Sequence, residues 1–195
     1  MINLKYPLIL ASKSPRRQQL LREAGFEFSI QPSPVKEDFP VNMNVIDIPT
    51  FLARKKAEGL LRLSVENIIL SADTLVVQND RILGKPGSSK EALEMLSLLS
   101  GKVHHVYTGV CIAYQNNCTT FIEKTEVHFK ELRSAEIDYY IRHYAPMDKA
   151  GAYGIQEWIG LIGITRIKGS YLNVVGLPVA QVYNKLYELK LLISE

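Results

Sequence analysis

Residues 68–73, Ile-Ile-Leu-Ser-Ala-Asp, predict a fully buried strand, and such a strand needs other parts of the fold to cover it. A second short apolar run, at residues 8–11, predicts another buried strand that leads directly into a helix. Along the rest of the chain the predicted strands and helices are intermixed and do not alternate strictly. This order predicts an α/β fold, an elongated domain built on a mixed β-sheet with flanking helices.

Turn and capping residues separate the other predicted elements. Helices are expected at about residues 15–24, 50–63, 135–144 and 177–191. A further helix is expected to begin after its N-cap Ser89 and to end at residue 99, and Ser134 is the expected N-cap of the 135–144 helix. Strands are expected at residues 26–31, 103–114 and 119–130, the last two as an antiparallel pair, and a small hairpin joins residues 76–77 to 81–83.

The composition is that of an ordinary globular protein. The chain has 195 residues, of which 47% are apolar and 22% charged. This length fits one large α/β domain or two small lobes, and we expect a single domain over residues 1–195. The net charge of +3 is small and the basic residues are scattered, so we expect no nucleic-acid partner. No apolar run approaches the about 18 residues of a membrane span, and the first residues show no secretory signal. We therefore expect no membrane association and a cytoplasmic location.

A basic segment stands at the predicted start of the first helix, where acidic residues are normally favoured. Ser14 is a preferred N-cap, Pro15 suits the first helical position, and Arg16 and Arg17 occupy the first turn. Free backbone N–H groups, the hydroxyls of Ser12 and Ser14 and two guanidiniums together suit a polyphosphate group. A solvated basic turn explains the same residues, and this segment alone does not separate the two interpretations.

Two further charged residues lie where apolar surroundings are predicted. At about 100° per residue, Lys56 falls between Leu52 and Leu60 on the apolar face of the 50–63 helix. An inward lysine needs an anionic partner or must extend past the edge of the core into water. Asp73 is predicted to end the buried strand at 68–73, and we expect it at the carboxyl edge of the sheet, where open α/β sheets bind ligands. A turn or cap role for Asp73 stays open.

Together these carboxylates and cations are the groups needed to bind a nucleoside triphosphate with a divalent metal ion. The common nucleotide-binding motifs are absent, because the sequence contains neither a Gly-x-x-x-x-Gly-Lys-Ser/Thr loop nor a Gly-x-Gly-x-x-Gly segment.

The sequence resembles the Maf family of nucleotide pyrophosphatases, the septum-formation-inhibitor-like proteins, nearly from end to end. Several short motifs carry the resemblance in order: Leu-Ala-Ser-Lys-Ser-Pro-Arg-Arg at 10–17, Glu37, Leu-Ala-Arg-Lys-Lys-Ala at 52–57, Ala-Asp-Thr at 72–74, Lys-Pro at 85–86, Leu-Ser-Gly at 99–101, Asp-Lys-Ala-Gly-Ala-Tyr-Gly-Ile-Gln at 148–156 and Gly-Ser-Tyr-Leu-Asn-Val-Val-Gly-Leu-Pro at 169–178.

The resemblance implies a cytoplasmic hydrolase that cleaves nucleoside triphosphates to the monophosphate and pyrophosphate with Mg²⁺, Mn²⁺ or a similar divalent ion. It also implies a Maf/ITPase-like fold with a central cleft between two lobes, and a possible homodimer.

The family motifs carry site roles over to matching positions of this chain. Asp73 is expected to accept the proton of the attacking water and, with Glu37, to hold the metal ion. Lys36 departs from the family pattern, in which an acidic residue commonly precedes this Glu, and this leaves the number of metal ions open. The other expected site residues select the base or bind phosphate: Arg16, Thr74 and Gln156 for the base, and Ser12, Ser14, Arg17, Lys56 and Lys85 for the phosphates.

Gln156 bears on the choice of base. Its amide offers a donor and an acceptor side by side, so it can accept from N3–H and donate to O4 of uracil or thymine. Resemblance to the Gln-bearing branch of the family therefore implies dTTP and UTP as substrates. Two alternatives remain at this stage: hydrolysis of 7-methyl-GTP, which another branch performs, and a non-catalytic protein of cell-division control.

Overall fold

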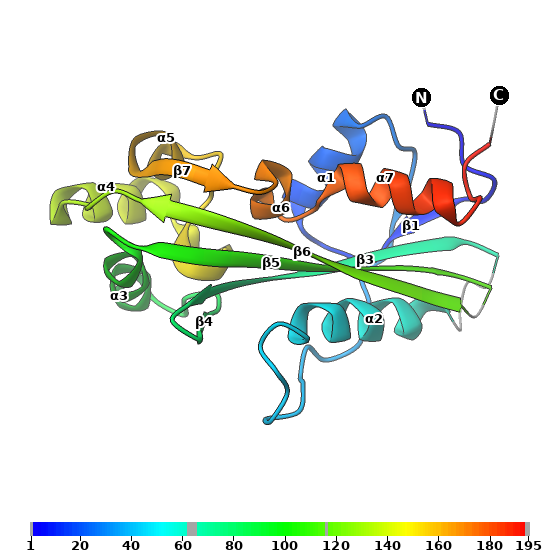
Figure 1. The fold of residues 1–195 in the computed structure, drawn as a ribbon, viewed down its shortest axis with the longest axis horizontal. Helices are drawn as coiled ribbons and strands as arrows, with labels where there is room; N and C mark the ends of the chain where they lie inside the picture. The colour runs from blue at the N-terminus through cyan, green and yellow to red at the C-terminus, as the bar shows by residue number, and fades with distance from the viewer. Residues whose placement is uncertain (1, 62–65, 116, 194–195) are drawn as a thin grey trace. The chain divides into compact units, whose positions relative to one another are not determined.

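The computed structural model describes residues 2–61, 66–115 and 117–193 of the chain (Figure 1). It divides into two compact units. Unit 1 comprises Met1–Asp73, Thr108–Glu123 and Gly176–Glu195, and unit 2 comprises Thr74–Tyr107 and Lys124–Val175. The single domain over residues 1–195 stays a prediction. In the described residues, no helix combines the length and the apolar character needed to cross a bilayer.

The strands of the described residues form one mixed sheet in the order β2-β1-β3-β5-β6-β7, with β4 paired to β3. Strand β1 runs parallel to β2 and β3, whereas β3–β4 and β6–β7 are antiparallel, so the predicted mixed sheet is confirmed. The bounds of the strands are β1 Leu8–Leu10, β2 Ser29–Ile30, β3 Ile68–Gln78, β4 Arg81–Leu83, β5 Val103–Tyr114, β6 Asn117–Phe129 and β7 Ile164–Lys168.

Along the chain, helices and strands are intermixed without strict alternation, as predicted (Figure 1). The bounds of the helices are α1 Pro15–Glu23, α2 Ile48–Leu61, α3 Ser89–Leu99, α4 Ser134–Tyr144, α5 Trp158–Gly163, α6 Tyr171–Val175 and α7 Val179–Glu188, with two short 3₁₀ segments, η1 Pro146–Asp148 and η2 Ala150–Ala152.

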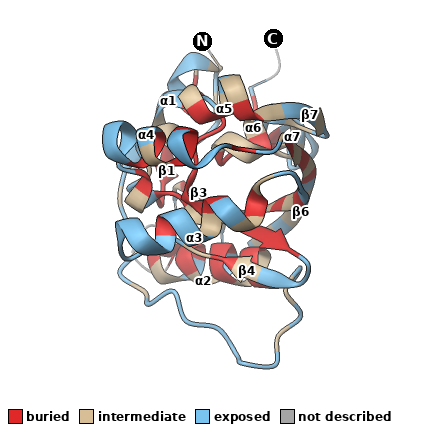
Figure 2. Ribbon diagram, turned by 90° about the vertical axis from the view of Figure 1, so that its left-hand side faces the viewer, coloured by how far each residue is buried: buried red, intermediate tan, exposed pale blue. Residues whose placement is uncertain are grey.

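In unit 1, helix α2 packs its apolar face on the sheet. Ala53, Ala57 and Leu60 of α2 share one buried cluster with Ile9 of β1 and Ile69 of β3. The same packing brings β5 very close to the start of the helix. A Cβ atom added at Gly109 would lie 2.2 Å from the backbone nitrogen of Thr50, so only glycine fits there. Most residues of the segment 31–47, which precedes α2, are exposed (Figure 2).

Unit 2 has its own core. Leu96 of α3, Tyr140 of α4 and Ile159 of α5 pack in one cluster with Val76 of β3 and Val127 of β6. Apolar residues on these helices recur every three or four positions, which places them on the face turned to the sheet.

Two predicted N-caps are each displaced by one residue. Ser88, not Ser89, caps α3, because the Ser88 hydroxyl accepts a hydrogen bond from the Glu91 backbone N–H at 3.2 Å. Arg133, not Ser134, is the N-cap of α4. The Glu136 side chain accepts a hydrogen bond from the Arg133 backbone N–H at 2.9 Å. A carboxylate in the first turn thus gives this free N–H group at the start of the helix its partner.

Other differences concern where elements end. Strand β3 continues through Asp73 to Gln78, because the apolar residues 75–77 extend the buried run. The predicted strand at 26–31 is reduced to β2, and the predicted helix at 177–191 is reduced to α7. Helix α2 starts two residues before the predicted start, and its predicted end at residue 63 lies outside the described residues. Helix α5 and strand β7 were not predicted.

Candidate functional site

The candidate site of unit 1 forms where the short strand β1 ends beside the longer β3. The two strands are parallel over residues 8–10 and 68–70, and the Ala11 N–H donates to the Leu70 carbonyl at 2.8 Å. The chain then leaves the sheet at Ser12, whereas β3 continues to Asp73 and beyond. Residues that follow β1 therefore lie along the side of β3 that β1 no longer covers, as ligand sites of open α/β sheets do.

Asp73 does not end its strand, so this prediction was wrong. It lies inside β3, with Thr74 next to it and four further strand residues after Thr74. Its side chain is 12% exposed. The carboxylate extends from a face of β3 toward α2, where Lys56 contacts it.

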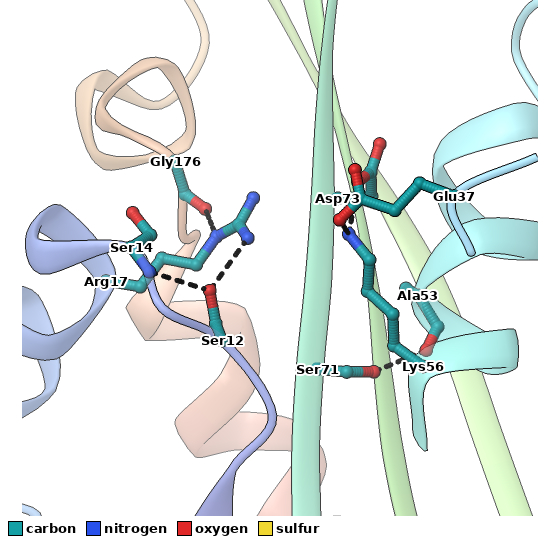
Figure 3. Close-up of polar contacts among 9 residues, drawn as sticks. All are labelled: Ser12, Ser14, Arg17, Glu37, Ala53, Lys56, Ser71, Asp73 and Gly176. Carbon is teal, nitrogen blue, oxygen red and sulfur yellow. Dashed lines mark hydrogen bonds and ion pairs between the residues drawn. The ribbon is translucent and has the colours of Figure 1, made fainter. Parts of the chain in front are cut away.

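The start of α1 forms a polar cluster of unit 1. The Ser12 hydroxyl accepts from the Ser14 backbone N–H at 3.2 Å and from Nη1 of Arg17 at 3.3 Å. Nε of Arg17 donates to the Gly176 carbonyl at 2.8 Å, which holds the guanidinium so that it points toward the strand that carries Asp73 (Figure 3). Ser14 is the N-cap of α1, as predicted, but its hydroxyl makes no capping hydrogen bond to the helix.

Arg17 is electrostatically coupled to the carboxylates of the same unit. Burial lowers the pKa of Arg17, and the charges of Asp73 and Glu37 oppose that effect. Arg16 precedes it and is half-buried, and no acidic residue stands in the first turn of α1. Two guanidiniums at a helix N-terminus form an electropositive surface that suits an anion.

Lys56 is buried on the apolar face of α2, and two carboxylates surround its ammonium group. Nζ lies 2.6 Å from Oδ1 of Asp73 and 2.8 Å from Oε1 of Glu37. Figure 3 shows the side chain running from α2 toward both of them. Of the two interpretations of an inward lysine, the structure supports the anionic partner, since the Lys56 side chain is only 10% exposed.

A second contact fixes α2 against β3 beside this ion pair. The Ser71 hydroxyl donates a hydrogen bond to the Ala53 carbonyl of α2 (Figure 3). Ser71 points to α2 from the same face of β3 as Asp73, because side chains two residues apart share one face of a strand. The serine in the apolar run 68–73 therefore helps to position Lys56 relative to Asp73.

The carboxylates fit a divalent metal ion. Asp73 and Glu37 contact the same ammonium group, so they lie close to one another, and carboxylate oxygens are the ligands that Mg²⁺ and Mn²⁺ prefer. Within residues 2–61, 66–115 and 117–193, no group of three or more His, Cys, Asp and Glu side chains is arranged as a metal site. The donor set suits an ion that takes its other ligands from substrate phosphates and water.

The other predicted site residues belong to unit 2. Thr74 follows Asp73 in β3, and Lys85 and Gln156 are exposed. The Gly151 N–H donates to the Gly84 carbonyl at 3.0 Å, so the segment that leads to Gln156 is fixed next to Lys85. Of the predicted site residues, unit 1 contains Ser12, Ser14, Arg16, Arg17, Glu37, Lys56 and Asp73.

One member of the unit 1 cluster was not predicted. The Gly176 carbonyl orients Arg17, but a backbone acceptor leaves no residue-type signal in a sequence. The available signal was the glycine itself. Its φ of 130° is rarely adopted by other residues, and it stands inside the motif at 169–178.

Comparison with known proteins shows the relatives of this chain. A Cytophaga hutchinsonii protein named dTTP/UTP pyrophosphatase is 46% identical over 179 residues, which cover 92% of this chain and 82% of that protein. A Phocaeicola vulgatus protein of the same name is also 46% identical, over 95% of this chain and 97% of its own length. The Staphylococcus aureus Ham1 protein structure matches with a TM-score of 0.49 and 13% identity over 92% of this chain and 99% of its own, too distant to support an argument.

The family comparison agrees with the motifs quoted from the sequence. The profile of the family described as Maf-like protein matches residues 7–189, and this range includes every predicted site residue from Ser12 to Gln156. The chain therefore belongs to the Maf family.

Proposed function

We propose that this chain is a nucleoside triphosphate pyrophosphatase that hydrolyses dTTP and UTP to the monophosphate and pyrophosphate. The observation that carries the proposal is the buried Lys56 held between Asp73 and Glu37, in the same unit as the basic start of α1. The names of relatives that are 46% identical support the reaction and the two substrates.

The cations of unit 1 are proposed to bind the triphosphate. The Ser12 and Ser14 hydroxyls and the N–H groups at the start of α1 donate to phosphate oxygens, and Arg17 adds a charge-assisted hydrogen bond. Lys56 is proposed to neutralise phosphate charge beside Asp73, and Lys85 is also proposed to bind phosphate. A bound phosphate adds to the compensation that Asp73 and Glu37 already give Arg17, because an anion is favoured at a helix N-terminus.

Asp73 is proposed to orient a water molecule and to accept its proton. The oxygen of the water then attacks the α-phosphorus, the bond from that phosphorus to the bridging oxygen breaks, and pyrophosphate leaves with the electron pair of that bond. The Lys56 ion pair holds the Asp73 carboxylate in a single orientation, which is what a general base needs.

A divalent metal ion is proposed as the cofactor, held by Glu37 and Asp73. When bound, such an ion neutralises charge on the phosphate oxygens and polarises the phosphorus centre. Lys56 contacts both carboxylates and is proposed to contact phosphate oxygens as well.

Base selection is proposed to rest on Gln156, Thr74 and Arg16. The Gln156 amide matches the N3–H donor and O4 acceptor of uracil and thymine. A reversed amide would match cytosine equally well, so Thr74 and Arg16 are proposed to disfavour that orientation.

A nucleotide panel tests the proposed function. Pyrophosphate release is measured from dTTP, UTP, CTP, dCTP, ATP, GTP and 7-methyl-GTP, each with Mg²⁺, with Mn²⁺ and with a chelator. We expect dTTP and UTP to give the highest kcat/KM, and the chelator to abolish release. A higher rate with 7-methyl-GTP would contradict the base assignment. Release from no nucleotide would favour a non-catalytic role in cell-division control.

Two further properties come from the family resemblance and are proposed with it. The protein is expected to act in the cytoplasm and to form a homodimer. Light scattering after size-exclusion chromatography measures the mass in solution, and a mass of one 22.0 kDa chain at micromolar concentration would contradict the dimer.

A further inference from the structure

In unit 2, Gln156 lies in a tight turn whose two ends are fixed. The Glu157 N–H donates to the Gly154 carbonyl at 3.0 Å, which closes a turn over Ile155 and Gln156. Gln156 is exposed, whereas residues 151–155 before it are all buried. An exposed amide is thus presented from a segment that is anchored inside the core of this unit.

Helix α4 fixes that turn through one phenol. The hydroxyl of Tyr140, a fully buried residue, accepts a hydrogen bond from the Gly154 N–H at 3.0 Å. The same hydroxyl donates to Oε2 of Glu157. Burial, and then the Glu157 carboxylate, raise the pKa of Tyr140, so the phenol stays protonated as this donor role requires. Tyr140 therefore connects the residue two before Gln156 to the residue one after it.

Lys149 also contacts the Glu157 carboxylate. Nζ of Lys149 lies 3.1 Å from Oε1 of Glu157 and 2.7 Å from Oδ1 of Asp148. The side chain of Lys149 is 9% exposed and that of Glu157 is 20% exposed. Charges taken this far out of water are costly, so their geometry is strongly restricted by the partners that compensate them.

Gly154 allows the carboxylate to approach. A Cβ atom added at Gly154 would lie 2.8 Å from Cδ of Glu157, closer than real contacts allow. The Glu157 side chain therefore folds back over Gly154, where its two oxygens meet Tyr140 and Lys149. These contacts fix Gly154 and Glu157, the residues on either side of the turn that carries the exposed Gln156.

We propose that Tyr140, Glu157 and Lys149 are positioning residues that hold Gln156 for recognition of the pyrimidine base. The inference rests on the proposed function, in which Gln156 contacts the base. An amide discriminates bases only if its donor and acceptor are held at fixed places, because a shift of about 1 Å loses the paired hydrogen bonds. The network fixes the backbone from which the Gln156 amide extends.

Tyr140→Phe tests the proposal, because it removes one oxygen atom and keeps the aromatic packing. We expect the KM for UTP and dTTP to rise about 10-fold, the scale of one lost buried hydrogen-bonding partner, while kcat changes less than about threefold. The preference for UTP over CTP in kcat/KM is expected to narrow by a similar factor. A merely structural role would lower the folded fraction, and hence the apparent kcat for every nucleotide, and leave KM and this preference unchanged.

Tyr144→Phe is the matched control. Tyr144 is an exposed residue of the same helix whose ring stacks on Tyr140 at a centroid distance of 5.1 Å. Removal of its hydroxyl is expected to leave KM and the base preference unchanged. Lys149→Met provides a second test from the other side of Glu157, with the same expected split between KM and kcat.

A readout that needs no substrate separates this inference from the proposed function. Trp158 is the only tryptophan of the chain and directly follows Glu157. Its near-ultraviolet circular dichroism is expected to weaken, and its quenching by acrylamide to rise, in Tyr140→Phe and Lys149→Met but not in Tyr144→Phe. If the wild-type protein releases no pyrophosphate from UTP or dTTP, the proposed function fails while this fluorescence test still reports on the network.

Two results would overturn the inference. One is an unchanged KM and base preference in both Tyr140→Phe and Lys149→Met. The other is an equal loss of apparent kcat for all nucleotides with an unaltered Trp158 signal, which would assign the network to overall stability alone.

Discussion

At the scale of single residues, the most informative one is Lys56. Helical periodicity placed it on an apolar face, and the structure surrounds its ammonium with Asp73 and Glu37. Taking a lysine out of water costs several kcal/mol, so a fold keeps such a residue where anions compensate it. In a protein that binds triphosphates, the phosphate groups of the substrate also compensate the charge of such a lysine.

Asp73→Asn tests the proposed general base. The amide keeps the size of the side chain but cannot accept a proton from water, so kcat is expected to fall at least about 100-fold. Nucleotide binding, measured by titration calorimetry, is expected to remain detectable because Lys56 and Arg17 are unchanged. Wild-type turnover in this variant would contradict the assignment.

Asp38→Asn is the control for that experiment. Asp38 is also a carboxylate of unit 1 paired with a lysine, Lys55, but its side chain is 73% exposed. Exposed pairs of this kind contribute little, so turnover and stability are both expected to stay near the wild-type values.

Gln156→Glu tests the base assignment. An ionised carboxylate only accepts hydrogen bonds, so it keeps the contact to N3–H and loses the donor to O4. The kcat/KM for UTP and dTTP is expected to fall about 10- to 100-fold, the scale of one buried polar group left without its partner. Competition between UTP and guanine nucleotides gives the ratio of their kcat/KM values. An unchanged preference for UTP would show that Gln156 does not contact the base.

At the scale of elements, the start of α3 illustrates how a one-residue difference changes a prediction. The Ser88 hydroxyl accepts from the Glu91 N–H, and the neighbouring Ser89 is the first residue of the helix itself. Ser88→Ala is expected to lower the free energy of unfolding by about 1 kcal/mol, whereas Ser89→Ala changes it by a few tenths. Urea unfolding of both variants measures the difference, and an equal effect would contradict the cap assignment.

The packing of β5 against the start of α2 gives a second prediction. A Cβ at Gly109 would lie 2.2 Å from the Thr50 nitrogen, and backbone cannot move aside as a flexible side chain does. Gly109→Ala is therefore expected to cost about 3 kcal/mol or more, at the upper end of overpacked sites. Gly84→Ala is the control, because an added Cβ there meets nothing within 4 Å. Thermal unfolding compares the two, and a stable Gly109→Ala protein would mean that α2 and β5 are less closely packed.

At the scale of the whole molecule, stability is expected to depend on pH through His104. This fully buried ring contacts the Tyr153 hydroxyl at 2.7 Å. Burial, and then the charges of His105 and His128, lower the pKa of His104 from 6.5 to about 3. The unfolded chain therefore binds a proton between these two values that the folded protein does not bind.

It follows that acidification from pH 6.5 toward about 3 favours the unfolded state. His104 contributes a loss of up to about 1.4 kcal/mol per pH unit in that window, and His104→Gln is expected to remove this contribution. Urea unfolding at several pH values compares the slopes of the two proteins. Parallel slopes would contradict a neutral, buried His104.

Several features of the fold could be predicted because local chemistry encodes them. The mixed sheet, the hairpin at Asn79 and Asp80 and the length of β5 follow from apolar runs and turn residues. Helix α5 and strand β7 were missed because glycines interrupt the short apolar segment there. Each element is also too short for a helical or strand-like repeat of apolar residues to be recognised.

The sequence by itself determined which residues are chemically unusual, because an inward Lys56, an Asp73 in an apolar run and a basic helix start are local properties. Only the tertiary structure decided which of them meet. Lys56 and Asp73 are 17 positions apart, and Arg17 and Gly176 are 159 apart. The parallel pairing of β1 with β3 and the packing of α2 on them bring such partners together, and these long-range contacts have no periodicity from which they can be predicted.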